Sequence, residues 1–183
     1  MPFSKSMNRS ELEHVIRATS GITGDPDIVV VGSQAVLAQF PEAPAVLLAS
    51  MEADVYPRHR PELSIQVDGA IGERSLFHET FGYYAHGVDE TTATLPAGWE
   101  ERLVPIRNEN TGGATGWCLE VHDLAASKLV AGRDKDFEFL RVLWREKMVS
   151  ADTLAERIGA LPLPPERLNL LRERLRRLQA ARP

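Results

Sequence analysis

The run of four β-branched apolar residues from Ile28 to Val31 constrains the fold most, because it ends abruptly at Gly32. Such a run is typical of a strand in the centre of a sheet, buried on both faces. A helical pattern follows the glycine as far as Phe40, after which a proline ends it. A strand buried in this way needs other elements over both faces of its sheet, so the sequence predicts a layered fold with strands at its centre.

Two carboxylates, Glu52 and Asp54, stand one residue apart in the next expected strand, residues 51–56. Residues i and i+2 of a strand point to the same face, so the two acids are expected to share one face. Neighbouring acids repel each other, and a folded protein keeps such a pair only with compensation from solvent or from a cation. The pair therefore predicts either a solvated edge-strand face or a site for Mg²⁺, which prefers oxygen ligands.

The rest of the chain predicts strands mixed with short helices up to about Val121, and four helices after it. This order is typical of an α+β fold, in which a core over residues 1–132 is followed by a helical region over residues 133–183 that packs on it. The other expected elements are a helix over Ser10–Ser20 with a Ser10/Glu13 capping box, a strand or helix at 61–69, a strand with its approach at 76–88, a hairpin of 102–106 with 116–121, and helices over Asp123–Gly132, Asp136–Lys147, Ser150–Ile158 and onward from Pro165.

Composition excludes several classes of protein. No apolar run approaches the roughly 20 residues of a membrane helix, and the polar N-terminus lacks the apolar core of a signal peptide, so no membrane partner is expected. The single cysteine, Cys118, rules out an internal disulfide framework and favours a reducing cytoplasm. The net charge of -5 argues against a protein that coats nucleic acid, although residues 164–183 hold six arginines against two glutamates. We expect those arginines on a solvated helix face.

A strand that ends in Gly-Ser, a helix, and a strand that bears acid-x-acid resemble the nucleotidyltransferase (polymerase-β-like) superfamily. The resemblance is closest to the minimal nucleotidyltransferases and the AbiEii-type toxin group. It covers roughly Asp27 to Trp144, through the segments VVVGSQAVLA, SMEADVYP and LEVHDLAASKLVAGRDKDFEFL. The resemblance implies a mixed sheet with flanking helices and a Mg²⁺-dependent transfer of a nucleotide from a nucleoside triphosphate to an unknown acceptor.

The chemistry of such a site suits the residue types present. A Gly-Ser turn at the start of a helix offers backbone N–H groups and a hydroxyl to an anion without a blocking side chain. Magnesium held by carboxylates neutralises phosphate charge, and a lysine adds a compact positive charge for the triphosphate. The resemblance implies catalytic roles for Glu52, Asp54, Lys128, Asp136 and Glu120, nucleotide binding by Gly32, Ser33, Lys128 and Arg133, and Mg²⁺ ligation by Glu52 and Asp54.

The chain departs from the family pattern at its third acid. Glu120 is the candidate, because alternation in an expected strand over residues 117–121 would let it share an open face with the acid pair. A plain exposed strand residue would look the same. Lys128 also has two interpretations, since its stem could lie along the core with the amine in water. His86 and Asp89 beside an aromatic patch could line a base pocket, or the aromatic residues could be core.

Three functional hypotheses follow. The first is an active nucleotidyltransferase, with RNA as a possible acceptor and an antitoxin-like protein as a possible partner, both by analogy with the toxin relatives. The second is a catalytically degenerate member of the same fold that acts as a nucleotide-binding or partner-interaction module. The third is an interaction protein that docks a partner on the leucine stripe between Leu168 and Leu178.

Overall fold

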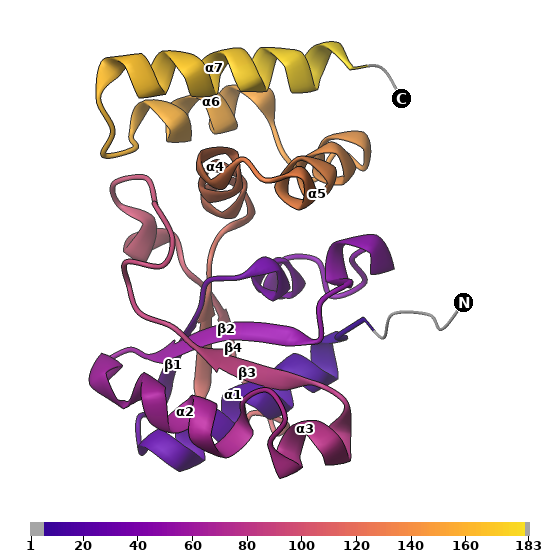
Figure 1. Cartoon of the computed structure of the whole chain (residues 1–183), viewed down its shortest axis with the longest axis vertical. Coiled ribbons are helices and arrows are strands. Elements are labelled where there is room, and N and C mark those ends of the chain that lie inside the picture. The colour runs from indigo at the N-terminus through magenta and orange to yellow at the C-terminus, as the bar shows by residue number, and fades with distance from the viewer. Residues whose placement is uncertain (1–5, 182–183) are drawn as a thin grey trace. The chain divides into compact units, whose positions relative to one another are not determined.

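The computed structural model describes residues 6–181, which form two compact units (Figure 1). The first unit holds the described part of Met1–Thr92 together with Leu103–Leu119. The second holds Ala93–Arg102 and the described part of Glu120–Pro183. The expected division of the chain at residue 132 stays a prediction, and each unit is described by itself below.

The first unit is built on one mixed sheet of five strands in the order β3-β2-β1-β5-β4. Strand β1 pairs antiparallel with β2 and parallel with β5, while β2 pairs parallel with β3 and β4 antiparallel with β5. This confirms the α+β class, the mixed sheet and the hairpin predicted from the sequence. The strands are β1 (Asp27–Val30), β2 (Glu52–Pro57), β3 (Tyr84–Gly87), β4 (Val104–Ile106) and β5 (Thr115–Cys118).

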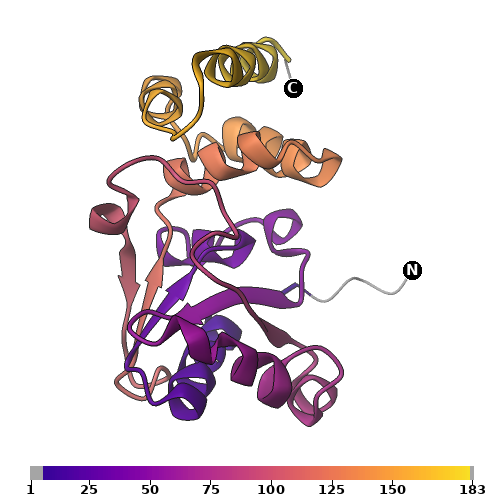
Figure 2. The ribbon, with the colours of Figure 1, turned by 60° about the vertical axis from the view of Figure 1, so that its left-hand side comes forward.

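Strand β1 lies in the middle of the sheet, as its β-branched sequence predicts. Ile28, Val29 and Val30 are at most 1% exposed, because strands lie on both sides of β1 and other elements cover both of its faces. Helices α1 (Arg9–Thr23), α2 (Ser64–Ile71) and α3 (Leu76–Phe81) lie on one side of the sheet. The short 3₁₀ helices η1 (Ser33–Ala38) and η2 (Ala45–Leu48) lie on the other (Figure 2).

The first helix begins one residue earlier than predicted and uses a different capping box. Asn8 and Glu11 cap α1 reciprocally, rather than Ser10 and Glu13. Glu13 is buried and accepts hydrogen bonds from the side chains of Asn108 and Asn110 in a distant loop. Glu13 therefore makes tertiary hydrogen bonds instead of the helix cap that the local pattern predicted.

The expected strand with its approach at residues 76–88 is shorter than predicted. Ser75 caps helix α3, which Gly82 ends in the left-handed conformation, so only Tyr84–Gly87 remains as β3. Residues 61–69, which fitted either a strand or a helix, form the 3₁₀ helix η3 (Pro61–Leu63) followed by the main part of α2. Both segments therefore form helices that pack against the sheet before the chain enters β3.

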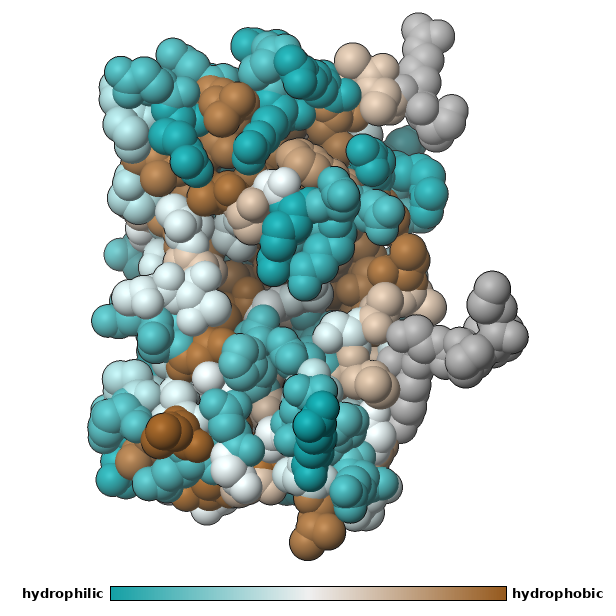
Figure 3. All heavy atoms as spheres, in the orientation of Figure 1, coloured by the Kyte–Doolittle hydropathy of each residue, from teal (hydrophilic) through white to brown (hydrophobic). Residues whose placement is uncertain are grey.

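The second unit is helical. No helix among residues 6–181 is long and apolar enough to cross a membrane. Leu171, Leu175 and Leu178 are buried where α7 packs on the other helices of this unit, so this part of the leucine stripe is internal core. Hydrophilic side chains cover most of the visible face of α7 (Figure 3). The unit contains η4 (Trp99–Arg102), α4 (Val121–Ala131), α5 (Asp134–Arg145), α6 (Ala151–Gly159) and α7 (Pro165–Ala180).

A buried ion cluster holds the second unit together. Asp123 is fully buried and accepts hydrogen bonds from Arg102 Nε and Nη2 at 2.8 and 2.9 Å. The Nε atom of Arg157 lies 3.1 Å from Asp123 Oδ1, in an orientation that makes an ion pair without a hydrogen bond. Asp123 was expected to cap α4, but Glu120 is the cap and Asp123 sits inside the first turn. It joins η4, α4 and α6 instead.

We expect Asp123→Ala to destabilise the protein by about 3 kcal/mol or more, because it leaves two arginines without their buried partner. Chemical denaturation followed by circular dichroism measures this loss. Glu138→Ala, which removes an exposed acid from the middle of α5, is the matched control and should change stability by less than about 0.5 kcal/mol. Equal stability of the two variants would show that the cluster contributes nothing to folding.

Candidate functional site

The acid pair on β2 and the facing residues of β3 form one cluster in the first unit. Glu52 and Asp54 are partly exposed, whereas Ala53 between them is fully buried. Because β2 and β3 run parallel with Glu52 opposite Tyr84 and Asp54 opposite His86, both strands present their polar side chains together. The sheet register therefore places a phenol and an imidazole beside the two carboxylates.

Hydrogen bonds tie each β3 side chain to an acid. The Tyr84 hydroxyl donates to Glu52 Oε2 at 2.9 Å. The Nδ1 atom of His86 lies 3.2 Å from Asp54 Oδ1 and 3.6 Å from Glu52 Oε1. His86 was considered from the sequence only for a base pocket, and Tyr84 was not considered for the site. Tyr84 and His86 are spaced to share one face of a strand, which was the available signal in the sequence. The expected strand region over 76–88 was too broad to single out these two residues.

Burial and the neighbouring acid make Glu52 reluctant to ionise. Its pKa is raised chiefly by burial and then by Asp54, and the interactions with Tyr84 and His86 only partly oppose this. Burial, together with Glu52, raises the pKa of Tyr84 to about 12, so the phenol remains a hydrogen-bond donor at neutral pH. In the protein alone, the two carboxylates are thus poorly compensated by their surroundings.

A divalent cation would supply the missing compensation. One potential ligand atom each from Glu52, Asp54 and His86 lie within 4.8 Å of one another. Two carboxylates suit Mg²⁺ and Mn²⁺, and an imidazole nitrogen adds a donor that suits other divalent transition metals. The donor set therefore fits a divalent metal, as predicted from the acid pair, with His86 as an additional candidate ligand.

The Gly32–Ser33 turn lies directly against this cluster. A Cβ atom added to Gly32 would lie 2.5 Å from Asp54 Oδ2, so any side chain there would have to displace the Asp54 carboxylate. The backbone N–H of Val31 donates to the carbonyl oxygen of Asp54 at 3.0 Å and fixes the end of β1 beside β2. Buried Gln34 donates from Nε2 to the carbonyl oxygen of Ser50 at 2.6 Å. The helix that follows is 3₁₀ rather than α-helical, and it is anchored to the start of β2.

Three other predicted site residues form their own network in the second unit. Lys128 Nζ lies 3.4 Å from Asp136 Oδ1 and 4.6 Å from the centre of the Phe139 ring. Asp136 is fully buried and accepts hydrogen bonds from the backbone N–H and Nε of Arg133. Burial lowers the pKa of Lys128, and Asp136 only partly offsets this. The structure brings these three residues together, and their action on a phosphate stays a prediction.

Glu120 does not lie in a strand, because β5 ends at Cys118. It is the N-cap of α4, where its carboxylate accepts the backbone N–H of His122 at 3.0 Å and contacts His122 Nδ1 at 2.7 Å. Burial raises its pKa, but the contacts with His122 outweigh this and lower it overall. The predicted alternation on an open strand face was therefore wrong, because the chain turns into a helix there.

The mixed sheet, the acid pair on β2 and the Gly32–Ser33 turn beside it are the features of a nucleotidyltransferase-type protein. The chain belongs to the family described as nucleotidyltransferase of unknown function (DUF6036), whose profile matches residues 10–161. Membership implies a nucleoside triphosphate substrate and, as for nucleotidyltransferases generally, use of a divalent metal. No curated protein and no solved structure matches the chain significantly.

The raised pKa of Glu52 predicts a stability effect that depends on pH. The folded protein favours the protonated form of Glu52. The free energy of unfolding therefore falls as the pH rises through the raised pKa of this carboxyl. We expect Glu52→Gln to raise Tm at pH 7 by up to about 3 °C when EDTA is present. At pH 3.5 the two proteins should melt together. Calorimetry at both pH values measures this, with Glu42→Gln as an exposed control, and a lower Tm at pH 7 would contradict it.

The close approach of Gly32 to Asp54 predicts that Gly32→Ala weakens metal binding. The added methyl group must displace the Asp54 carboxylate, which should reduce Mn²⁺ affinity by about tenfold or more in calorimetric titration. Gly21→Ala is the matched control, since a Cβ there meets nothing within 4 Å and alanine favours helix α1. Unchanged Mn²⁺ affinity in Gly32→Ala would show that the Gly32 turn does not affect the metal site.

Proposed function

We propose that this protein is a Mg²⁺-dependent nucleotidyltransferase that transfers a nucleotide from a nucleoside triphosphate to a hydroxyl-bearing acceptor. The observation that carries the proposal is the pair Glu52 and Asp54, partly buried against the Gly32 turn and short of positive charge. A metal bound there would neutralise phosphate charge and align the substrate. Family membership supports this class of reaction.

In the proposed reaction an acceptor oxygen forms a bond to the α-phosphorus, and the bond to the leaving pyrophosphate breaks. Positioning and electrostatics carry most of such a transfer. Glu52 and Asp54 hold the metal in this proposal, His86 is a third ligand or orients Asp54, and Tyr84 orients Glu52 through its hydrogen bond. Gly32 lies against Asp54, and in this proposal the backbone N–H groups of the Gly32–Ser33 turn bind a phosphate.

The remaining predicted residues act on the triphosphate in this proposal. Lys128 would give up part of its ion pair with Asp136 to meet a phosphate, and Arg133, which is 60% exposed, would assist it. Asp136 then acts by holding both cations. Glu120 remains the proposed acceptor of the hydroxyl proton, although its capping bonds to His122 already engage both carboxylate oxygens.

The proposed acceptor and protein partner follow from the sequence resemblance. AbiEii-type toxins suggest RNA as the acceptor and an antitoxin-like protein as the partner, and the exposed arginines of α7 would be the candidate RNA contact. Two of them, Arg176 and Arg177, pair with Glu173 on their own helix. The alternative to catalysis is a degenerate member of the family that binds nucleotide without transfer. Among residues 6–181, the group around Glu52 and Asp54 contains His86 but no third carboxylate, and this favours the alternative.

Calorimetric titration with each nucleoside triphosphate tests the proposal. We expect wild-type protein to bind at least one of them only with Mg²⁺, and Asp54→Asn to bind it about tenfold or more weakly, because one metal ligand loses its charge. Glu79→Gln, an exposed acid on α3, should keep the wild-type affinity. Equal and metal-independent affinity in wild type and Asp54→Asn would remove the proposed site.

Transfer itself separates the enzyme from the degenerate alternative. Incubation of α-³²P-labelled triphosphates with an extract of cells should label a defined fraction in the presence of wild type but not of Asp54→Asn. Nucleotide binding without any such labelling would favour the binding module.

A further inference from the structure

The Gly32–Ser33 turn is attached at two points to the segment that carries the acid pair. Before the turn, the backbone N–H of Val31 donates to the carbonyl oxygen of Asp54 at 3.0 Å. After the turn, the side chain of Gln34 donates from Nε2 to the carbonyl oxygen of Ser50 at 2.6 Å. The acid pair lies within the segment that these two points span, so the attachments hold the turn beside the acids.

The attachment through Gln34 continues to the first acid of the pair. The carbonyl oxygen of Ser50 binds Gln34, and its Oγ accepts the backbone N–H of Glu52 at 3.0 Å. The carbonyl oxygen of Met51, between them, accepts the backbone N–H of Tyr84 at the start of β3. Gln34, Ser50 and Glu52 therefore form one chain of hydrogen bonds that runs from the turn to a proposed metal ligand.

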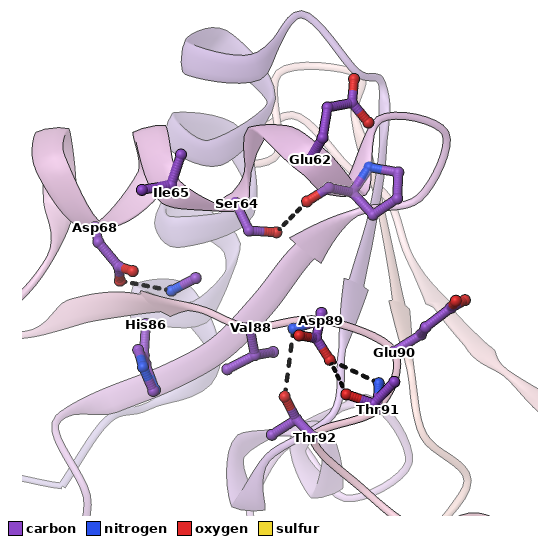
Figure 4. A pocket seen from close by; sticks show the side chains of 12 residues that line it. Glu62, Ser64, Ile65, Asp68, His86, Val88, Asp89, Glu90, Thr91 and Thr92 are labelled. Atoms are coloured by element: carbon purple, nitrogen blue, oxygen red, sulfur yellow. Dashed lines mark hydrogen bonds between the residues drawn. The ribbon is translucent and has the colours of Figure 1, made fainter.

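The two sides of the acid pair differ in how firmly they are held. In the sheet, β2 lies between β3 and β1. On the β3 side, the side chain of His86 is 52% exposed and borders an open pocket of about 610 Å³ (Figure 4). On the β1 side, Gln34 is fully buried directly after the turn. The fixed geometry of the acids relative to a bound phosphate would therefore come from the β1 side.

Glutamine is a costly residue for this buried place. Its Nε2 must face Ser50, since the opposite orientation of the amide would bring two oxygens together. Its Oε1 is buried and has no hydrogen-bond partner among residues 6–181. A buried acceptor without a partner destabilises a fold, and an apolar side chain of the same shape avoids this cost. Stability alone would therefore favour an apolar residue at position 34, so the bond to Ser50 calls for another reason.

We propose that Gln34 is a positioning residue, which holds the Gly32–Ser33 turn and Glu52 in a fixed relation through Ser50. In that relation one metal ion can meet both the acid pair and a phosphate bound at the turn. The inference rests on the proposed nucleotidyltransferase function. Gln34 itself touches neither metal nor nucleotide, because its side chain is fully buried.

The rest of helix η1 is held without the bond from Gln34. Ala35, Val36 and Leu37 are fully buried, and Arg9 Nη1 donates to the carbonyl oxygen of Leu37 at 2.9 Å. Gln34→Met keeps the length of the side chain but removes both the bond to Ser50 and the unpartnered oxygen. We therefore expect this variant to fold with an unchanged or higher Tm. A lower Tm with unchanged ligand affinity would make Gln34 purely structural and overturn the proposal.

Calorimetric titration of the full chain with the complex of Mn²⁺ and inorganic tripolyphosphate measures the positioning. This probe carries a metal and phosphates but no base, so the result does not depend on base preference. Gln34→Met should bind it about fivefold or more weakly than wild type, because the turn and Glu52 are no longer held together. Gln66→Met, the same change at an exposed position of α2, is the matched control and should keep the wild-type affinity. Equal affinity in Gln34→Met and wild type would overturn the proposal.

Ser50→Ala tests the chain of hydrogen bonds at its other link. It removes the Oγ that accepts the Glu52 N–H and leaves the carbonyl oxygen that binds Gln34. Ser50 is exposed, so the variant should fold, and it should also weaken the complex. Gln34→Met/Ser50→Ala should lose no more affinity than the weaker of the two single variants, because either change already breaks the chain. Unchanged affinity in Ser50→Ala, or losses that multiply in the double variant, would refute the route through Ser50.

Wild type and Asp54→Asn separate failure of this inference from failure of the proposed function. If wild type binds neither the Mn²⁺ complex nor any nucleoside triphosphate, the proposed function fails and the positioning role falls with it. If wild type binds the complex and Asp54→Asn loses it while Gln34→Met does not, the metal site stands and only the role of Gln34 is refuted.

Discussion

The repulsion between Glu52 and Asp54 is the interaction on which the functional face of the first unit depends. The two carboxylates share one face of β2, and burial adds to the cost of ionising Glu52. Tyr84 and His86 on β3 lower this cost but do not remove it. A cation bound at this face would relieve the repulsion, so the same arrangement that weakens the fold would favour metal binding.

The features that could be predicted from the sequence are those encoded by neighbouring residues. The β-branched run before Gly32 specified a buried central strand, since only a strand covered on both faces hides four such side chains. The one-residue spacing of Glu52 and Asp54 specified a shared face, because side chains in a strand alternate. Glycine at position 32 was expected to leave room for an anion; the structure places the Asp54 side chain against it, and anion binding at the turn stays a prediction. In each case the physical cause lies within a few residues.

Two of the features that could not be predicted depend on contacts between distant segments, and a third depends on where a helix begins. His86 joins Asp54 only through the register of β2 with β3, and no local pattern encodes that register. Glu13 looked like half of a capping box but serves two asparagines of a loop about 95 residues away. Glu120 alternated with apolar neighbours as a strand residue would, yet its affinity for free backbone N–H groups made it a helix cap. Contacts between distant segments decided the first two cases, whereas capping within α4 itself decided the third.

Part of the positive charge of the second unit is engaged by acids of the same unit. Within the second unit, Lys128 and Arg133 share Asp136, and Arg157 pairs with Asp123, so part of its positive charge is matched internally. In the proposed reaction, a triphosphate would compete with Asp136 for Lys128, because its phosphates bring several charges against one carboxylate.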